Sequence, residues 1–316
     1  MKRMGSMICC LCLLLSLAGC TGSKNKLETK EGLFFDTAIS ISVYSNQSEK
    51  VLKGSFELCE ELEKTFSRTK EGSELYQVNH REESSVTLSD DLARVVQEGI
   101  DFYEISEGAF DITIAPLLEL WDFKSKDAVV PDEELIQAAA DRVDGSAIHL
   151  TGNVLTFDRE DTEIDLGALA KGYAADKLKA YLVEEGVESA MINLGGNVLA
   201  IGVKADGSPW KVGIQKPFAE RGETSEVLEV KDKSVVSSGI YERYFEQDGV
   251  LYHHILNPDT GYPVDTGFSQ VTIISESSLL GDALSTVCLL AGPEKAEEIT
   301  GRFPDVELHY VLADPN

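Results

Sequence analysis

The order in which helix-like and strand-like patterns follow one another is the feature that most restricts how this chain can fold. The clearest helical period covers residues 48–66, where apolar side chains repeat on one side: Leu52, Phe56, Cys59, Leu62 and Phe66. Helical patterns dominate the first half of the chain, and short strand-like runs dominate the second half. Regular βαβ winding would alternate the two patterns throughout. The sequence therefore predicts an α+β fold, with packed helices on mixed or antiparallel sheets.

Turn and capping residues set the expected bounds of the other elements. Aspartate favours the start of a helix, proline its first turn and glycine its end. On this basis, helices are expected from Asp90 or Asp91 onward, from Pro131 to about 142, from about 168 to 185 before Gly186, and from about 278 to 291. Strands are expected over 34–44, 190–194, 198–203, 210–214, 227–230, 251–256 and 271–275, with a hairpin over 147–158. No repeat or linker divides residues 34–316, so one domain is expected.

The N-terminus carries a separate signal. Two positive residues precede an apolar run over 7–17, which is far shorter than the roughly 20 residues that a membrane-spanning helix needs. Residues 1–19 are therefore interpreted as a signal peptide rather than a buried or spanning helix. The sequence Leu-Ala-Gly-Cys that ends at Cys20 resembles a bacterial lipobox, in which the cysteine receives acyl chains such as palmitate. We expect residues 20–33 to form a lipidated, flexible tether that holds the protein outside the cytoplasm on the cell membrane.

Charge and cysteine content narrow the possible partners. The formal net charge is −27, which argues against binding to nucleic acid or electrostatic adhesion to anionic lipid. Only Cys59 and Cys288 remain after the signal peptide and Cys20. Each lies in an apolar helical pattern, where a free cysteine behaves as a small hydrophobic residue. A disulfide between them stays open, because sequence alone does not reveal pairing.

A carboxylate and a hydroxyl near the C-terminus suggest a cation site. Asp282 and Thr286 are spaced i, i+4 on an expected helix and therefore share one face. Oxygen donors on one face suit Mg²⁺, which usually leaves positions open for phosphates. A merely solvated pair is the alternative. His254 precedes a Pro-Asp-Thr-Gly turn, a setting that distinguishes it from His80, His149 and His309, which we interpret as structural.

A second segment suggests an anion site. Residues 164–173 form a strand end, a turn of small residues and a helix start that carries Lys171. Free backbone N–H groups and the helix dipole favour an anion at such a place, and an anionic partner would explain a lysine there. A solvated lysine is the alternative. Neither a Walker sequence nor a Gly-x-Gly-x-x-Gly motif is present, which excludes a P-loop and a Rossmann crevice.

Three further segments have both a structural and a functional interpretation. Residues 108–116 can be a turn with an aspartate cap. Residues 193–197 contain a double glycine that suits a hairpin or the close approach of a flat ligand. Residues 237–243 combine polar and aromatic side chains just before the strand that leads to His254.

These segments form an ordered series of motifs. The series is Phe110-Asp111, Asp165-Leu166-Gly167 with Lys171-Gly172-Tyr173, Asn193-Leu194-Gly195-Gly196, Ser238-Gly239, His254-Ile255-Leu256-Asn257-Pro258, and Asp282 with Thr286. It resembles the FAD:protein FMN transferases of the ApbE family from about residue 35 to residue 292. The resemblance implies a single ApbE-like, T-fold-like catalytic domain over residues 34–316. Many members of that family are exported lipoproteins, in agreement with the lipobox.

The resemblance implies a reaction. FAD and Mg²⁺ bind, the FMN half passes to a threonine or serine hydroxyl of an acceptor protein through a phosphoester bond, and AMP leaves. Acceptors are typically subunits of membrane redox complexes or secreted flavin reductases. The enzyme is thus a phosphotransferase.

The resemblance also assigns residues to roles. FAD would be contacted by Phe35, Thr69, Ala109, Phe110, Asp111, Asp165, Lys171, His254 and Ile255. Mg²⁺ would be bound by Asp282, Thr286 and the backbone carbonyl of Ala168, with Ser285 as a further contributor. Two positions depart from the family pattern of cofactor packing. Thr69 stands where many members carry an aromatic residue, and Phe35-Asp36-Thr37 stands where many read Met-Gly-Thr.

The implied chemistry leaves two points open. A hydroxyl nucleophile needs a base within hydrogen-bond reach, and His254 has a suitable ordinary pKa, but Asp282 or a metal-bound water is an alternative. A Mg²⁺-dependent FAD pyrophosphatase would use the same site with water as the nucleophile. A lipoprotein that only binds flavin is the third hypothesis, although storage needs no cation on the pyrophosphate.

Overall fold

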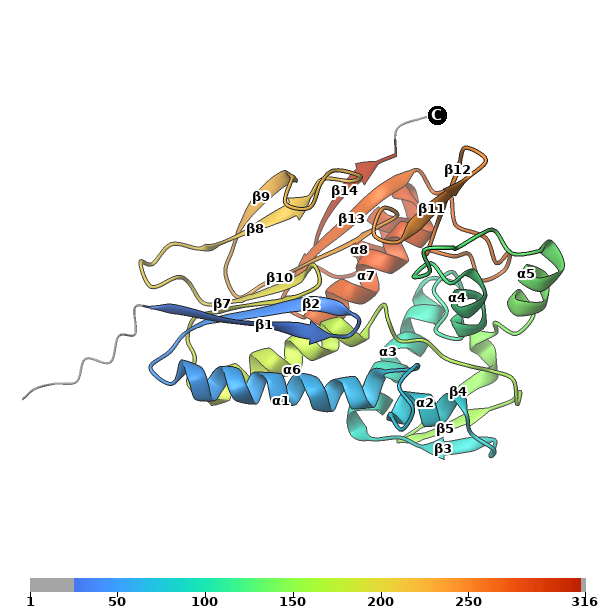
Figure 1. Cartoon of the computed structure of the whole chain (residues 1–316), viewed down its shortest axis with the longest axis horizontal. Coiled ribbons are helices and arrows are strands. Elements are labelled where there is room, and N and C mark those ends of the chain that lie inside the picture. The colour runs from blue at the N-terminus through green and yellow to red at the C-terminus, as the bar shows by residue number, and fades with distance from the viewer. Residues whose placement is uncertain (1–25, 314–316) are drawn as a thin grey trace, which may run out of the picture.

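The computed structural model describes residues 26–313, and its centre is an antiparallel sheet of seven strands (Figure 1). The strand order is β1-β2-β6-β7-β10-β13-β14. The bounds are β1 Leu27–Phe34, β2 Thr37–Tyr44, β6 Ala190–Leu194, β7 Asn197–Ile201, β10 Ser234–Gly239, β13 Phe268–Ser275 and β14 Glu307–Leu312. Every pairing in this sheet is antiparallel.

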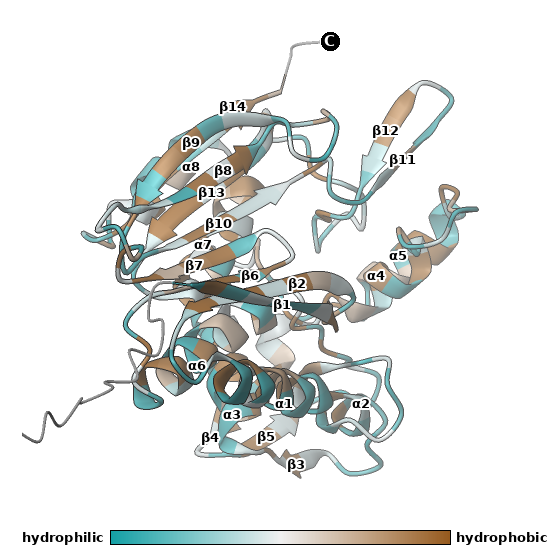
Figure 2. Cartoon of the chain, turned by 60° about the vertical axis from the view of Figure 1, so that its left-hand side comes forward, coloured by the Kyte–Doolittle hydropathy of each residue, from teal (hydrophilic) through white to brown (hydrophobic). Residues whose placement is uncertain are grey.

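Helices cover one face of the sheet and a two-stranded ribbon covers the other (Figure 2). The helices are α1 Ser48–Phe66, α2 Glu74–Asn79, α3 Asp90–Ile105, α4 Ala115–Trp121, α5 Glu133–Ala140, α6 Ala170–Glu184, α7 Ser278–Ala291 and α8 Pro293–Thr300. The ribbon is β8 Trp210–Gln215 with β9 Thr224–Val230. Alternate residues of β7 point to opposite faces, so Leu199 joins the helical core while Val198 and Ala200 pack under the ribbon. The predicted α+β architecture with packed helices is confirmed.

Two smaller sheets lie beside this body. One pairs β3 Ser85–Thr87, β5 Val154–Phe157 and β4 Ile148–Thr151, so the hairpin predicted over 147–158 is present. The other is the hairpin of β11 Tyr244–Gln247 and β12 Val250–His253. It packs with α4 and α5 around Trp121 in a separate core, which we call the Trp121 cluster (Figure 1). Its other members are Leu117, Ile136, Ala139, Ala140 and Leu256, with Phe123, Phe245, Tyr252 and Tyr262 packed against them.

The first strand corrects the expected tether and the expected strand over 34–44. Residues 27–33 were expected to be flexible, but β1 runs from Leu27 to Phe34 and pairs with β2 along its whole length. Phe35 and Asp36 form the tight turn between them, both with positive φ. The sequence hides β1 because half of its residues are polar and most are exposed on this edge of the sheet. The proposed signal peptide and Cys20 lie outside the described residues.

Other element bounds differ locally from expectation. The helix after Pro131 begins two residues later, with Asp132 as its N-cap, and α6 begins at Ala170 rather than near 168. The strand expected over 251–256 ends at His253, which leaves His254 on the loop that follows. In contrast, α1 and α7 have the predicted bounds.

Two further expectations concern membranes and cysteines. Among residues 26–313, no helix is both long and apolar enough to cross a membrane. Cys59 and Cys288 are free and buried, so the open question of a disulfide is answered by two separate thiols. Burial raises the pKa of each thiol to about 12. Both therefore act as small core residues.

Candidate active site

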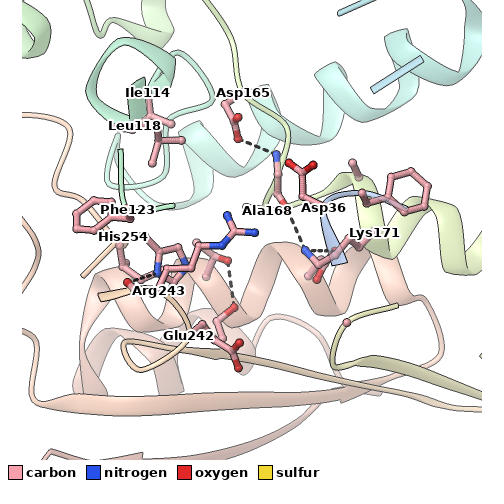
Figure 3. A pocket seen from close by; sticks show the side chains of 18 of the residues that line it. Asp36, Ile114, Leu118, Phe123, Asp165, Ala168, Lys171, Glu242, Arg243 and His254 are labelled. Atoms are coloured by element: carbon pink, nitrogen blue, oxygen red, sulfur yellow. Dashed lines mark hydrogen bonds and ion pairs between the residues drawn. The ribbon is translucent and has the colours of Figure 1, made fainter. Parts of the chain in front are cut away.

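A pocket of about 850 Å³ lies where the seven-stranded sheet, α6, α7 and the Trp121 cluster meet. Its lining comes from the β1–β2 turn, the loop after α1, residues 109–124, the turn before α6, β10 with the residues that follow it, the loop after β12, and α7. Figure 3 shows Ala168 and Lys171 on one side of the pocket and Arg243 and His254 on the other. A pocket of this size suits a cofactor-sized ligand.

Asp282 is the buried carboxylate of the α7 wall. Its side chain is 4% exposed, and its Oδ2 accepts the backbone N–H of Gly172 at 2.5 Å. The Nζ of Lys171 lies 3.8 Å from the same oxygen. Burial raises the pKa of Asp282, while the Lys171 charge and the Gly172 N–H act in the opposite direction. A cation in the pocket would offset the burial of this carboxylate.

The turn before α6 supplies a second oxygen. In a regular α-helix the Ala168 carbonyl would accept a hydrogen bond from the N–H of Gly172, four residues later. Here the Gly172 N–H donates to the Asp282 carboxylate instead. The Ala170 N–H donates to the Leu166 carbonyl, and the next i, i+4 bond at the start of α6 runs from Tyr173 to Leu169. The carbonyl of Ala168 accepts no hydrogen bond from the described residues, and Ala168 lines the pocket.

Two hydroxyls follow Asp282 on α7, and they differ in position. Thr286 lines the pocket. Ser285 is fully buried, and its hydroxyl donates to the Asp282 carbonyl at 3.0 Å. The Ser238 Oγ lies 2.8 Å from the Ser285 Oγ and 3.3 Å from the Thr286 Oγ1. The Ser285 hydroxyl thus lies in the wall behind the pocket, and its assignment as a further contributor to the metal site stays a prediction.

Lys171 and Asp165 mark the two ends of the turn before α6. The Nζ of Lys171 donates to the Gly167 carbonyl at 3.0 Å. The Oδ1 of Asp165 accepts the Gly167 N–H at 2.8 Å, and its Oδ2 accepts Nε of Arg68 at 2.8 Å. Asp165 thus fixes the turn and ties it to the loop after α1. This pairing with Arg68 was not foreseen, because 97 residues separate the two.

His254 faces Lys171 from the loop after β12. Its Nδ1 lies 3.2 Å from the Arg243 carbonyl, which also accepts the His254 backbone N–H at 3.1 Å. Because a carbonyl only accepts, Nδ1 carries the proton and Nε2 holds a free electron pair. Burial in the pocket wall, together with the nearby Arg243 charge, lowers the pKa of His254 to about 3. The imidazole is therefore neutral at physiological pH.

The neighbouring His253 holds this loop in place. It is 4% exposed, its Nε2 donates to the Val264 carbonyl at 3.0 Å, and its Nδ1 accepts the Ile255 N–H at 3.3 Å. Ile255 is buried and also lines the pocket. Burial lowers the pKa of His253 to about 4, against the bond to Val264.

Phe35 and Thr69 lie at the opposite rim. Phe35 sits at the β1–β2 turn, where its N–H donates to Oε1 of Glu63 at 2.9 Å. Its φ of 52° is in the left-handed region, which is unusual for an aromatic residue. Thr69 is exposed and lines the pocket. Both of these departures from the family pattern therefore face the same space.

The segment 109–111 lines the pocket, but its side chains turn inward. Phe110 is 4% exposed and packs edge-on against Phe102. The Oδ1 of Asp111 accepts the N–H and hydroxyl of Thr113, each at 2.7 Å, and its Oδ2 accepts the Gly145 N–H at 2.7 Å. Burial raises the pKa of Asp111, while these bonds lower it. Ala109 is half-buried at the pocket edge.

Several polar residues of the pocket had no predicted role, among them Arg221, Glu242 and Asn197. Arg221 and Glu242 enter it from the β8–β9 loop and from the segment after β10. Asn197 is 2% exposed, and its Oδ1 accepts the Ser278 hydroxyl at 2.7 Å. Its Nδ2 forms no hydrogen bond with the described residues, although the amide favours the charged form of Asp282. The double glycine before Asn197 was the only sequence signal near it.

The donor set of this pocket fits a hard cation and a phosphate. Asp282, Thr286 and Ala168 offer a carboxylate, a hydroxyl and a free carbonyl, which are oxygen ligands that Mg²⁺ accepts. The described residues contain no cluster of three or more His, Cys, Asp or Glu side chains that could hold a metal, so ligands from a bound substrate would have to complete the shell. Lys171 and the unsatisfied Asn197 amide suit anionic oxygens.

Comparisons with known proteins agree with this geometry. The model of the ApbE family matches residues 35–309. The "FAD:protein FMN transferase" of Treponema pallidum (strain Nichols) is 32% identical over 99% of this chain and 91% of that protein. The protein of the same name from Vibrio cholerae serotype O1 is 33% identical over 90% and 87% of the two chains. The solved "Flavin Transferase ApbE from Vibrio cholerae" superposes with a TM-score of 0.82 at 28% identity, over 91% of this chain and 94% of that chain. This chain belongs to the ApbE family.

Proposed function

We propose that this protein is an FAD:protein FMN transferase that uses Mg²⁺. It transfers the FMN half of FAD to a threonine or serine hydroxyl of an acceptor protein and releases AMP. The observation that carries the proposal is the meeting, in one pocket, of the oxygen donors around Asp282 with Lys171 and the neutral His254. The names of the relatives support the same reaction.

The proposed reaction is a displacement at the FMN phosphorus. The acceptor oxygen forms a new bond to that phosphorus, and the bond to the bridging oxygen breaks. AMP leaves with the electron pair of that bond. Mg²⁺, held by Asp282, Thr286 and the Ala168 carbonyl, would neutralise the pyrophosphate charge.

The side chains around the pyrophosphate have separate tasks in this proposal. Lys171 stabilises charge that develops on the AMP leaving group. The Nε2 of His254 accepts the proton of the attacking hydroxyl, because its tautomer leaves a free electron pair there. The Asn197 amide donates to a phosphate oxygen, which would satisfy its free N–H.

The test uses residues 21–316 with FAD, Mg²⁺ and the apo form of a threonine-bearing acceptor domain from a membrane redox complex. Intact mass of the acceptor and release of AMP are followed together. A mass gain of one FMN with matching AMP supports the transferase. AMP and free FMN with an unmodified acceptor would favour the pyrophosphatase alternative, and bound FAD without AMP would leave a flavin-binding protein.

We further propose that Cys20 is the lipidated N-terminus of the mature protein. Under this proposal, the catalytic domain works outside the cytoplasm on the bacterial cell membrane, close to acceptor subunits of redox complexes or secreted flavin reductases. The lipobox-like sequence before Cys20 supports it. Membrane fractionation checks it: Cys20→Ala is expected to move the protein out of the membrane fraction.

A further inference from the structure

Three aromatic side chains form a ridge at the surface, which we call the aromatic ridge: Phe218 and Tyr244 are exposed, and Tyr241 is half-buried. The ring of Phe218 meets the Tyr241 ring at 5.9 Å and the Tyr244 ring at 5.5 Å, both edge to face. Phe218 is 50% exposed and Tyr244 is 42% exposed. Exposed aromatic rings that stack on one another are typical of recognition surfaces.

The ridge is continuous with the mouth of the active-site pocket. Phe218 lies in the β8–β9 loop, and Arg221 of the same loop lines the pocket. Tyr241 and Tyr244 flank Glu242 and Arg243, which also line the pocket. Each chain segment that builds the ridge therefore also supplies a charged side chain to the pocket.

Hydrogen bonds hold the ridge in shape. The side-chain amide of Gln215 donates to the carbonyls of Lys216 and Glu220 at 3.2 and 3.0 Å, and its Oε1 accepts the Gly222 N–H at 3.1 Å. The buried amide of Gln270 then donates to the Gln215 carbonyl at 3.1 Å and to the Tyr241 hydroxyl at 2.5 Å. The loop and Tyr241 are thus tied to β13. A surface that is already ordered loses little entropy when it binds.

The backbone of Phe218 is unusual for an exposed residue. Its φ of 57° lies in the left-handed region, where glycine and asparagine are far more common than aromatic residues. Phe218 belongs to none of the three buried cores. The stability of the fold therefore does not explain why a phenylalanine occupies this position.

The charges beside the ridge indicate the chemistry of a partner. The whole chain has a net charge of −27, yet Arg221 and Arg243 both line this pocket, together with the carboxylate of Glu242. Two guanidinium groups next to exposed rings suit a polypeptide that combines apolar and acidic side chains.

We propose that the aromatic ridge is the docking surface for the acceptor polypeptide. This inference rests on the proposed function, in which a protein hydroxyl must enter the pocket to reach the FMN phosphorus. The acceptor segment that carries the hydroxyl lies across the ridge, with an apolar side chain on Phe218 and Tyr244 and acidic groups toward Arg221 and Arg243. FAD binding does not involve the ridge.

The test substitutes the two exposed rings. Phe218→Asn suits the left-handed backbone and removes the ring, so the loop is expected to keep its shape. Tyr244→Ser removes the second ring. We expect each change to raise the KM for the apo acceptor domain about tenfold, because aromatic residues at interfaces often dominate the binding energy. The dissociation constant for FAD, measured by flavin fluorescence, should stay unchanged, and Phe218→Trp should restore the acceptor KM.

The matched control is Val183→Ala on α6, which removes an apolar side chain that is 54% exposed and does not line the pocket. It should leave the acceptor KM unchanged.

An unchanged acceptor KM in both ridge variants, with transfer intact in the unsubstituted protein, overturns the ridge proposal alone. Absence of transfer in the unsubstituted protein overturns the proposed function and the ridge with it. If Phe218→Asn converts a dimer to a monomer in sedimentation while transfer is unaffected, the ridge is a contact between copies instead.

Discussion

The two walls of the pocket are built in different ways. The α6–α7 wall belongs to the large aliphatic core, and it carries Asp282 and Thr286 on a buried helix. The opposite wall belongs to the Trp121 cluster, where Phe123, Leu256 and His254 are carried by loops around stacked aromatic rings. The first wall presents oxygen atoms for a cation and phosphates. The second presents an imidazole on a loop.

This difference indicates how the demands of the reaction are divided. A buried carboxylate needs a rigid frame, because a small shift would leave it without its backbone donor. Aromatic rings on loops provide a large contact area from few residues. The α6–α7 wall, which would hold the cation, is therefore coupled to the stability of the whole fold. The wall that carries His254 is coupled to the smaller Trp121 cluster instead.

The largest expected effect separates function from stability on the α6–α7 wall. Asp282→Ala and Asp282→Asn should each lower AMP release at least about 100-fold, because the pyrophosphate loses its cation. The fold should persist, since burial already disfavours the charged carboxylate. AMP release at saturating FAD and Mg²⁺, with a thermal melt of each variant, measures both. Full activity of Asp282→Ala in the presence of Mg²⁺ would contradict the metal assignment.

The second prediction tests the rigidity of the same wall. A Cβ added at Gly172 would lie 2.4 Å from the Ser278 carbonyl oxygen and 2.7 Å from the Leu279 Cα. Backbone atoms cannot move aside easily, so Gly172→Ala should lower the free energy of unfolding by about 2–3 kcal/mol and should also reduce transfer.

A glycine on α1 is the control for this substitution. A Cβ at Gly54 would lie 2.0 Å from the hydroxyl oxygen and 2.7 Å from the Cζ of Tyr181, which are the far end of a side chain that can rotate away. Gly54→Ala should therefore be neutral or stabilising in chemical denaturation, because alanine favours a helix by about 1 kcal/mol over glycine. Equal losses in the two variants would contradict a tight α6–α7 contact.

The third prediction concerns pH and the loop wall. The pKa of His253 is lowered from 6.5 to about 4 in the folded protein. At pH values between 4 and 6.5, His253 is therefore protonated in the unfolded chain but neutral in the folded chain. Because the unfolded state binds the additional proton, the free energy of unfolding should decrease as pH falls from 6.5 to 4. The contribution of this residue is on the order of 3 kcal/mol. Urea unfolding of the unsubstituted protein and of His253→Gln across this range checks it, and parallel curves for the two proteins would argue against the prediction.

The smallest effect compares two tryptophans. Trp121→Phe removes the Nε1 hydrogen bond to the Gly261 carbonyl, 2.8 Å long, in the Trp121 cluster. Trp210→Phe removes a similar bond of 3.1 Å to the Ile201 carbonyl, under the β8–β9 ribbon and away from the pocket. Both should lose about 1 kcal/mol of stability. Only Trp121→Phe should also lower the rate of FMN transfer, by a few-fold. A similar loss of transfer in Trp210→Phe would remove the distinction between the Trp121 cluster and the core under the β8–β9 ribbon.

The parts of the fold that sequence predicted are those whose own periodicity determines them. The helices α1 and α7 have strong apolar repeats, so their predicted bounds match. The strand β1 was missed because its partner β2 orders it, while half of its own residues are polar and most are exposed. The Trp121 cluster was missed because its rings come from distant segments and have no shared period.

The same reasoning applies to the candidate site. The family resemblance placed Lys171, His254, Asp282 and Thr286 in one site, and all four line the pocket. It did not distinguish Ser285 from Thr286, since positions three and four residues after Asp282 both share its side of the helix. Burial separates the two residues: Ser285 is completely buried, whereas Thr286 lines the pocket. That burial arises only when β10 packs on α7.

The early start of β1 has a consequence for the distance over which the protein can work. Only six residues lie between Cys20 and Leu27, and the seven Cα-to-Cα steps between them span about 25 Å at most. Under the proposed lipidation of Cys20, the domain would be confined to a thin layer above the bilayer. Encounters with acceptors would then depend on their surface density and on lateral diffusion. An acceptor whose hydroxyl projects far from the membrane would be out of reach, however abundant it is.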